Sequence, residues 1–535
     1  MYERISKSSM EKMLLKFPQY RRYLFQKGFL LTDAQTNFVM DNYPFYCNWK
    51  KITFNNYQLL VHNDENFYIK TDESASIVLI GHAVDAVNAK YSEDVIIADL
   101  LYQWKNKQYD AFWNRESGLT GIYLLIIADD KGIHFSVDCA GMQYSHYGIV
   151  GKNIYISSHS ILVADLCNLS VDKYISRLIN YKLFKLYGNW LPADSSPYKE
   201  LKRVQPNCQY TYSREKVSFD RIYPKEKIVP VESESDYNHI VNQCAAILHS
   251  SLDLYSQKWP NRAAISVTGG KDSLTTLACA NGLYEKFKYF SYDSCPQERI
   301  DALAAKQVCE SLHLPHSFYE IEGEAQLEGY EQFNMLLEYN LGCTGPVKLN
   351  NVNKRIFFSN CSDFDIEVKS WVDEIGRARY HKRFAKRKLP QKMRARYCTC
   401  LYKIFITNRR LLRETDQVFK KYITKYYGSD VLNKIPWYDL FYWEFSFGAG
   451  DAFFLRAEHR MSYDIAIPFN NRRLVDLMLH VPLSYRIEDR IQKDIIRMRN
   501  DQIEKTGVSV VDANYTTLRT LFERVYLEIN SRLPF

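Results

Sequence analysis

Long hydrophobic runs are missing from this chain of 535 residues. No apolar stretch approaches the ~18–20 residues that a helix needs to cross a bilayer, and the polar start of the sequence lacks the apolar stretch of a signal peptide. The twelve cysteines are scattered, and the closest two, Cys398 and Cys400, have no second pair at metal-ligand spacing. The sequence therefore predicts no membrane span and no zinc site, and it favours a reducing, cytoplasmic setting.

Acidic residues are missing from one segment. The net charge of +8 is mild for a chain of this size, but between Arg377 and Arg413 there are fourteen Lys or Arg and no Asp or Glu. A solvated helical face is the usual explanation of a basic run. An anionic ligand or partner at 377–413 is the alternative, and the sequence leaves both open.

The most informative segment is 263–273, in which a short apolar run leads into two glycines and then into an amphipathic stretch. The run Ala263–Val267 is typical of a buried parallel strand. Successive backbone N–H groups near the glycines and the start of the following helix can converge on a phosphate. Lys271 adds a positive charge, and Asp272 could hold Mg²⁺ between phosphate oxygens. The predicted nucleotide-binding residues are Ser266, Thr268, Gly269, Gly270, Lys271, Asp272 and Ser273.

The composition of residues 224–235 predicts a linker that divides the chain near residue 230, into parts 1–230 and 231–535. Ser235 or Asp236 could cap the helix that follows it. The first part has short β-prone runs separated by turn residues, which indicates a sheet-based layered domain of the α+β class. These runs are Ser76–Gly81, Gly121–Ala128, Ile133–Val137, Asn153–Ser157, Cys208–Tyr212 and Val217–Ile222, with helices expected at Asp94–Trp104 and Tyr174–Tyr187.

The second part alternates between strand-like and helical segments, which predicts an α/β fold with a doubly wound parallel sheet. Its expected strands are Ala263–Val267, Phe287–Tyr292 and Arg355–Ser359. From about residue 375 onward the pattern is mostly helical. Phosphates bind beyond the carboxyl ends of such strands, which is where the turn after Val267 would lie.

The segment Thr268–Ser273 resembles the S-G-G-x-D-S loop of the N-type ATP pyrophosphatases. Most of the chain resembles asparagine synthetase-type proteins, in which a glutaminase-like domain of the Ntn-hydrolase type precedes an ATP pyrophosphatase domain. Further matches to that family are Leu119–Leu125 (L-x-G-x-F-A-F), Tyr198–Pro206 (F-x-G-I-x-R-L-P-P), Glu298–His316, Ile467–Val475 (P-F-L-D-x-R-L-V) and Lys493–Arg497 (K-x-x-L-R).

The first part departs from this family at its glutaminase residues. The family's nucleophilic Cys at position two is Tyr2 here, and its Asn-Gly-Glu falls on Ile80-Gly81-His82. A tyrosine cannot replace a low-pKa thiolate at neutral pH, so glutamine hydrolysis is not expected. The first domain is then a structural or docking unit, as in the similar β-lactam synthetases and lasso-peptide cyclases, where an amine that is already present attacks the adenylate.

The acidic motif that the family carries after its third strand is matched best by Asp373 and Glu374. Without a gap in the comparison, Asp363 or Asp365 would take this place, and the sequence leaves the choice open. The resemblance implies that Asp272 and one of these acids bind Mg²⁺ beside the pyrophosphate of ATP.

The resemblance implies a ligase that adenylates a substrate carboxylate, releases pyrophosphate and passes the acyl group to an amine or ammonia. Lys493 would balance the developing charge, and Tyr442 with Glu444 would form the base that activates the amine. The carboxylate could belong to a small molecule, a sugar acid or a peptide. Two alternatives are a nucleobase-modifying enzyme acting on tRNA through 377–413, and a non-catalytic scaffold.

Overall fold

The computed structural model describes residues 5–342, 348–383, 389–405, 408–456, 461–508, 510 and 517–532. Two six-stranded antiparallel sheets are built from residues before 222. The first has the spatial order β10 (Leu201–Arg203), β8 (His146–Val150), β9 (Asn153–Ser157), β1 (Phe29–Thr32), β3 (Tyr57–His62), β2 (Trp49–Phe54). The second has the order β12 (Lys216–Arg221), β11 (Cys208–Ser213), β7 (Gly132–Val137), β6 (Leu119–Asp129), β5 (Ser76–Asp85), β4 (Phe67–Thr71).

Strand β5 shows why these sheets form layers. Val78 and Ile80 belong to the large core that also holds Leu30 of β1, whereas Ile77 and Leu79 belong to a separate core under helices α2 (Glu93–Lys105) and α3 (Tyr109–Ser117). Alternate side chains of a strand point to opposite faces. The expected layered α+β arrangement is therefore present, with one face of the second sheet toward the first and the other covered by helices. The other helical segments of this part are α1 (Lys7–Lys16), η1 (Pro18–Tyr23), α4 (Ser160–Cys167), α5 (Lys173–Ile179) and η2 (Phe184–Tyr187).

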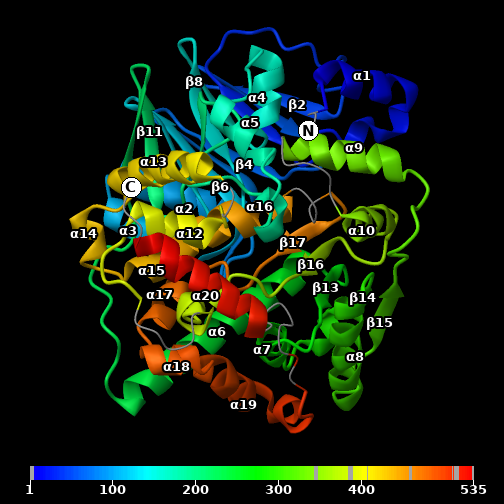
Figure 1. Cartoon of the computed structure of the whole chain (residues 1–535), viewed down its shortest axis with the longest axis vertical. Helices are drawn as coiled ribbons and strands as arrows, with labels where there is room; N and C mark the ends of the chain where they lie inside the picture. Colours follow the sequence, from blue (N-terminus) through cyan, green and yellow to red (C-terminus); the bar gives the residue numbers. More distant parts are fainter. Residues whose placement is uncertain are drawn as a thin grey trace.

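A five-stranded parallel sheet follows, and in Figure 1 it lies below the antiparallel sheets. Its order is β15 (His316–Glu320), β14 (Lys288–Asp293), β13 (Ala263–Ser266), β16 (Ile366–Val368), β17 (Asp464–Ala466). The chain runs outward from β13 to β15 and then returns to the other side of β13 as β16. The strand order thus reverses between β13 and β16, which is the switch point where such sheets bind ligands. The helical segments before β16 are α6 (Glu234–Lys258), α7 (Lys271–Cys279), η3 (Tyr284–Lys286), α8 (Pro296–Ser311), α9 (Tyr330–Leu341) and α10 (Leu349–Ser359).

The residues after 372 are mostly helical, as the sequence predicts, apart from the short strand β17. Their segments are η4 (Asp373–Ile375), α11 (Arg379–Arg383), α12 (Ala395–Tyr402), α13 (Arg409–Tyr426), α14 (Ser429–Leu432), α15 (Trp437–Phe441), the π-helical η5 (Tyr442–Asp451), α16 (Ala452–Phe454), α17 (Arg472–Leu479), α18 (Leu483–Ile487), α19 (Arg490–Lys505) and α20 (Thr517–Arg532). Within the described residues, no helix combines the length and apolar character that crossing a membrane requires.

An expected strand and an expected helix cap are wrong. The strand expected at Arg355–Ser359 is the end of helix α10, because Val352 and Ile356 lie four residues apart on one buried helical face. The cap of α6 is neither Ser235 nor Asp236 but Ser233, whose Oγ accepts a hydrogen bond from the backbone N–H of Asp236 at 3.0 Å. The helices expected at Tyr174–Tyr187 are present as α5 and η2.

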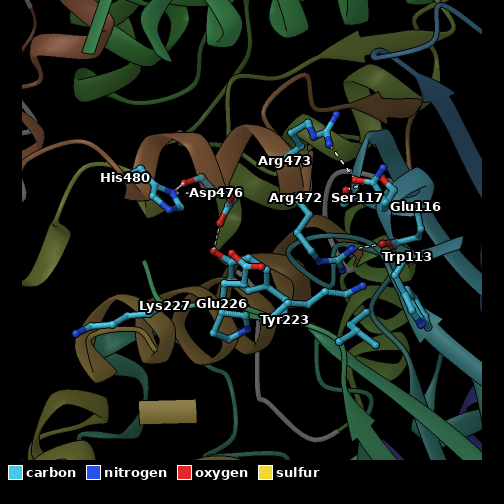
Figure 2. Close-up of a pocket in the computed structure, with 14 residues that line it drawn as sticks. Trp113, Glu116, Ser117, Tyr223, Glu226, Lys227, Arg472, Arg473, Asp476 and His480 are labelled. Carbon is cyan, nitrogen blue, oxygen red and sulfur yellow. Dashed lines mark hydrogen bonds and ion pairs between the residues drawn. The ribbon is translucent and has the colours of Figure 1, made fainter. Parts of the chain in front are cut away.

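The two halves of the chain share one large hydrophobic core. Polar residues just before and at the start of α17 also bind the first half: Asn470 Nδ2 donates to Asp138 Oδ1 at 2.8 Å, and Asn471 Nδ2 donates to Gly118 O at 2.8 Å. Arg472 forms a buried ion pair with Glu116. Figure 2 shows these two side chains pointing toward each other at a cavity of about 390 Å³ between α3, α17 and residues 222–227. The boundary near residue 230 stays a prediction.

Candidate active site

The predicted phosphate-binding turn connects β13 to α7 at the switch point of the parallel sheet. The backbone N–H of Thr268 donates to Ser273 Oγ at 2.9 Å, and that of Gly270 donates to Thr268 Oγ1 at 3.3 Å. Helix α7 begins directly after Gly270, so its free N–H groups and the positive end of its dipole lie at this turn. These contacts hold the turn in a shape that can receive an anion.

Of the two glycines in the turn, only Gly269 stands where a side chain would not fit. Neither has a left-handed backbone, and Gly270 has a φ of −76°. A Cβ on Gly269 would instead lie 2.7 Å from the Cβ of Ala304 on α8 and would collide with Val510. A Cβ on Gly270 would meet only Thr268 Oγ1, at 3.4 Å. Close packing, rather than backbone freedom, therefore explains Gly269.

We expect Gly269→Ala to destabilise the protein by about 1–3 kcal/mol, because the new methyl group overpacks a contact with the short side chain of a helix. Urea unfolding measures this change. The matched variant Gly270→Ala should change stability by less than about 0.5 kcal/mol, since its Cβ enters ordinary contact distance. Equal losses in the two variants would contradict the packing explanation.

A cavity of about 380 Å³ lies beside the turn. Two buried lysines line it, and each is paired with a carboxylate: Lys354 Nζ lies 2.6 Å from Glu298 Oε1, and Lys369 Nζ lies 2.8 Å from Glu367 Oε1. Burial alone would lower the pKa of Lys369, but the facing Glu367 raises it above its ordinary value. The wall of the cavity therefore carries two buried Lys–Glu ion pairs. The lining residues include Ser266, Thr268, Gly270, Asp272, Ser273, Ser291, Tyr292, Ser370, Trp371 and Glu374.

Three carboxylates from two segments meet at the edge of this cavity. Asp272 stands in the first turn of α7, and Asp373 and Glu374 begin η4 just after β16. Burial and the negative charge of Asp272 raise the pKa of Asp373 well above its ordinary value, and the same two causes raise the pKa of Glu374 to about 8. The three acids thus repel one another unless a cation lies between them.

Val372 brings the acids of η4 to this place through a strained backbone. Its φ is 81°, a left-handed conformation that costs a β-branched residue about 1–3 kcal/mol. Its side chain is fully buried, and its carbonyl accepts the backbone N–H of Ile375 at 3.0 Å. The surrounding packing therefore fixes a turn that isolated residues would avoid.

The donor set fits a divalent cation bound together with phosphate. Asp373 Oδ2 and Glu374 Oε2 are buried atoms with no hydrogen-bond partner, and both belong to hard oxygen ligands of the kind that Mg²⁺ prefers. In the described part of the chain, no group of three or more His, Cys, Asp or Glu side chains is placed so that it could hold a metal ion. Phosphate oxygens would have to complete such a site.

The structure separates the two candidate acid pairs. Asp363 and Asp365 precede β16, whereas Asp373 and Glu374 follow it, so the pairs lie at opposite ends of the strand. Asp365 pairs with the exposed Arg262 at 2.5 Å, and Asp363 Oδ2 accepts from Tyr319 at 2.5 Å. Only the second pair lies near Asp272.

Lys493 does not line the cavity, because it is exposed on α19. The contact from this helix to the acids comes from the preceding residue: Gln492 Nε2 donates to Asp373 Oδ1 at 2.8 Å. Asp489, just before α19, binds the turn residue Lys271 at 3.3 Å. This end of the helix is therefore part of the site, through side chains that the sequence analysis did not select.

The expected base pair lies elsewhere. Glu444 is fully buried at the contact between the two halves, where its carboxylate pairs with Arg221 and accepts from Asn207 Nδ2 at 3.2 Å. The ring centroids of Tyr442 and Tyr380 lie 5.4 Å apart. Neither residue lines the cavity. The geometry thus favours a structural role for Glu444, because its charge is already neutralised.

We expect Glu444→Gln to lower the free energy of unfolding by about 1.5–3 kcal/mol, since it weakens a hydrogen bond to the charged Arg221. The turnover of the folded fraction should stay within twofold of the unchanged chain. Urea unfolding and pyrophosphate release, measured on the same preparation, separate the two effects. A hundredfold loss of turnover without loss of stability would restore the expected catalytic role.

The basic segment 377–413 is neutralised in part by acids of other segments. Five of its cations form ion pairs; they are Arg377 and Lys382 with Asp489, Arg383 with Glu523, Arg396 with Asp416, and Arg410 with Glu414. Lys386, Arg387 and Lys388 lie outside the described residues. Folding therefore supplies counter-charges to at least five of the fourteen cations, and an anionic partner at 377–413 stays a prediction.

The position compared with the glutaminase nucleophile, Tyr2, lies outside the described residues. The first strand of the antiparallel sheets begins only at Phe29, after α1 and η1. His82, which stands at the family's Glu, is buried, and its Nε2 lies 2.7 Å from Ile465 O in the second half of the chain. This side chain thus contacts the second half instead of facing a glutamine pocket.

No family model matches the chain. Over 260 residues the chain is 22% identical to the glutamine-hydrolyzing asparagine synthetase 1 of Bacillus subtilis (strain 168), and the match covers 48% of this chain but only 39% of that protein.

Two solved structures were also found. Glutamine phosphoribosylpyrophosphate amidotransferase from B. subtilis, complexed with ADP and GMP, is 10% identical over 59% of this chain and 64% of its own, with a TM-score of 0.20. The allosteric regulatory enzyme of purine biosynthesis is 13% identical over 54% and 63%, with a TM-score of 0.22. Scores at this level do not establish a common fold. Over about half of its length, this chain is thus similar in sequence to an asparagine synthetase.

Proposed function

We propose that this chain is an ATP-dependent ligase that activates a carboxylate as its AMP ester and joins the acyl group to an amine. The observation that carries the proposal is the position of the turn 267–270. It lies at the strand-order reversal of a parallel sheet, beside a cavity of about 380 Å³ and next to Asp272 and Asp373. The partial likeness to an asparagine synthetase supports the same class of reaction.

In the proposed reaction, a carboxylate oxygen of the substrate bonds to the α-phosphorus of ATP while the bond to the bridging oxygen of pyrophosphate breaks. The amine nitrogen then bonds to the acyl carbon, AMP leaves, and the nitrogen loses a proton. The N–H groups at the start of α7, Ser273 and Lys271 hold the leaving pyrophosphate. A divalent cation held by Asp272 with Asp373 or Glu374 would neutralise charge on the phosphate oxygens.

Lys354 and Lys369 are the cations of the cavity wall, and we assign to them the charge-balancing role that the sequence suggested for Lys493. Both are buried and already ordered by Glu298 and Glu367, so they need little reorganisation as charge develops. Preorganised charge of this kind is often the largest single contribution to catalysis. In the proposed reaction the amine nitrogen does not come from glutamine hydrolysis in the first half of the chain.

The products test this proposal. With ATP, Mg²⁺ and a panel of carboxylates and amines, we expect AMP and pyrophosphate in equal amounts, detected by chromatography and a coupled pyrophosphate assay. Glutamine should be left intact. Formation of ADP and phosphate would show that the turn does not present the α-phosphorus, and release of glutamate would overturn the assignment of the first half.

A further inference from the structure

Arg377 lies where a cation is needed among the acids of the site. Its guanidinium forms an ion pair with Asp272 through Nη1, and the same Nη1 lies 3.8 Å from Asp373 Oδ2. Its Nε donates to Asp489 Oδ1 at 2.6 Å. The arginine side chain is only 16% exposed. One positive group thus joins the carboxylate at the turn, a carboxylate after β16 and a carboxylate before α19.

Arg377 does not satisfy this cluster completely. Asp373 Oδ2 and Glu374 Oε2 remain buried without a hydrogen-bond donor, and an unpaired buried oxygen is costly. The nearby acids Asp272, Asp373 and Asp489 form ion pairs with Arg377, Lys271 and Lys382. Two carboxylate oxygens of the cluster are therefore available to a cation that replaces a proton or Arg377.

An arginine and a divalent cation cannot occupy the same carboxylates at once. A cation on Asp272 and Asp373 must displace Arg377 from both. Phosphate is a strong alternative partner for arginine, because the planar guanidinium group can donate two parallel hydrogen bonds to its oxygens. We propose that Arg377 closes the metal-binding position in the nucleotide-free chain and leaves it for the phosphates of the incoming nucleotide, so that metal and nucleotide enter together.

Asp489 keeps its contact with Arg377 during this exchange. It lies next to α19 and also pairs with Lys271 and Lys382. Burial would raise its pKa, but Arg377 and Lys382 hold that pKa below the ordinary value. Because Asp489 remains charged, Arg377 keeps one partner near the site after it leaves Asp272. The inference rests on the proposed nucleotide-binding function of the turn, since phosphate is what draws the arginine away.

Manganese binding to the full chain tests the exchange without any need for turnover. Mn²⁺ is titrated into the nucleotide-free protein at pH 7, and the free ion is measured by electron paramagnetic resonance. We expect Arg377→Gln to bind one Mn²⁺ at least tenfold more tightly than the unchanged chain. The matched control is Lys382→Gln, which removes a positive charge from the same network but leaves Arg377 in contact with Asp272 and Asp373. Burial lowers the pKa of Lys382 to about 8. The titration is done at pH 7 because this lysine still carries its positive charge there.

The control separates displacement from general electrostatics. If Lys382→Gln and Arg377→Gln tighten Mn²⁺ binding equally, loss of charge alone explains the result and the exchange is wrong. Mn²⁺ binding that is unchanged in Arg377→Gln also overturns it. Should Arg377→Gln fail to fold, Arg377→Lys keeps the charge but cannot bridge two carboxylates, and we expect at least threefold tighter binding.

Nucleotide binding by the unchanged chain is measured separately by calorimetry with ATP. Absence of ATP binding would remove the proposed function, while a tighter Mn²⁺ site in Arg377→Gln would still show that the arginine closes the metal position. ATP binding without any change in Mn²⁺ affinity would leave the function standing and remove the exchange. The two failures are therefore distinguishable.

Discussion

Asp272→Asn should lower the formation of AMP and pyrophosphate by about 10²–10³-fold, the usual cost of removing one preorganised electrostatic group from an active site. The substitution keeps the shape of the side chain but removes the charge that Arg377 now neutralises and that a divalent cation would use. Initial rates of pyrophosphate release at saturating ATP measure the effect.

Two measurements make this prediction specific. Asp365→Asn removes the same charge from the same half of the chain at an exposed ion pair, and its rate should stay within twofold. Circular dichroism and urea unfolding should show that Asp272→Asn still folds, because its partner Arg377 keeps Asp489. A folded Asp272→Asn with full activity would contradict the proposed role of the turn.

The parts of the site that the sequence predicts are local ones. The strand, the turn and the helix at 263–273 are adjacent in the chain, and their residue types fix their order without help from distant contacts. The acids Asp373 and Glu374 could be proposed only through the resemblance to a family. The structure adds the reason why they meet Asp272: β13 and β16 are parallel neighbours, so their carboxyl ends coincide.

The parts that sequence reasoning missed depend on long-range packing. Strands β16 and β17 have three residues each, too few to show a two-residue alternation. Because β16 is too short to recognise, the sequence predicts the third strand at the nearest apolar run, Arg355–Ser359, which is helical in the structure. Lys354 then had no predicted place, although it lines the cavity.

Ion pairs between residues far apart in the sequence are equally hard to predict. Arg377 belongs to a segment without acids, and Asp489 lies 112 residues further along the chain. Nothing local indicates that these side chains pair. An acid-free basic segment is therefore weak evidence for an external anion until the acids that fold against it are known, and here five of its cations have internal partners.

The contact between the two halves should depend strongly on the pair Arg472 and Glu116. These side chains are 4% and 1% exposed, and Glu116 Oε1 also accepts from Tyr123 at 2.8 Å. We expect Arg472→Met to destabilise the protein by about 3–5 kcal/mol, because it leaves a buried carboxylate without its counter-charge. Urea unfolding measures the loss. Arg410→Met, which removes an exposed arginine paired with Glu414, should cost less than about 1 kcal/mol.

The pH dependence of this loss identifies its cause. Burial raises the pKa of Glu116, and Arg472 opposes the rise. Without Arg472 the pKa of the folded state rises further above the unfolded value of about 4.3. Below that value Glu116 is protonated in both states, so the loss is smallest there. As the pH rises toward the folded pKa, the unfolded state loses its proton first and stability falls. Both chains lose stability in this way, but the loss stops at a lower pH in the unchanged chain, because Arg472 keeps the folded pKa of Glu116 lower there. The difference between the two chains should therefore grow as the pH rises above the folded pKa of Glu116 in the unchanged chain. A difference that stays constant from pH 4 to pH 8 would mean that lost packing, and not an unpaired charge, weakens the contact between the halves.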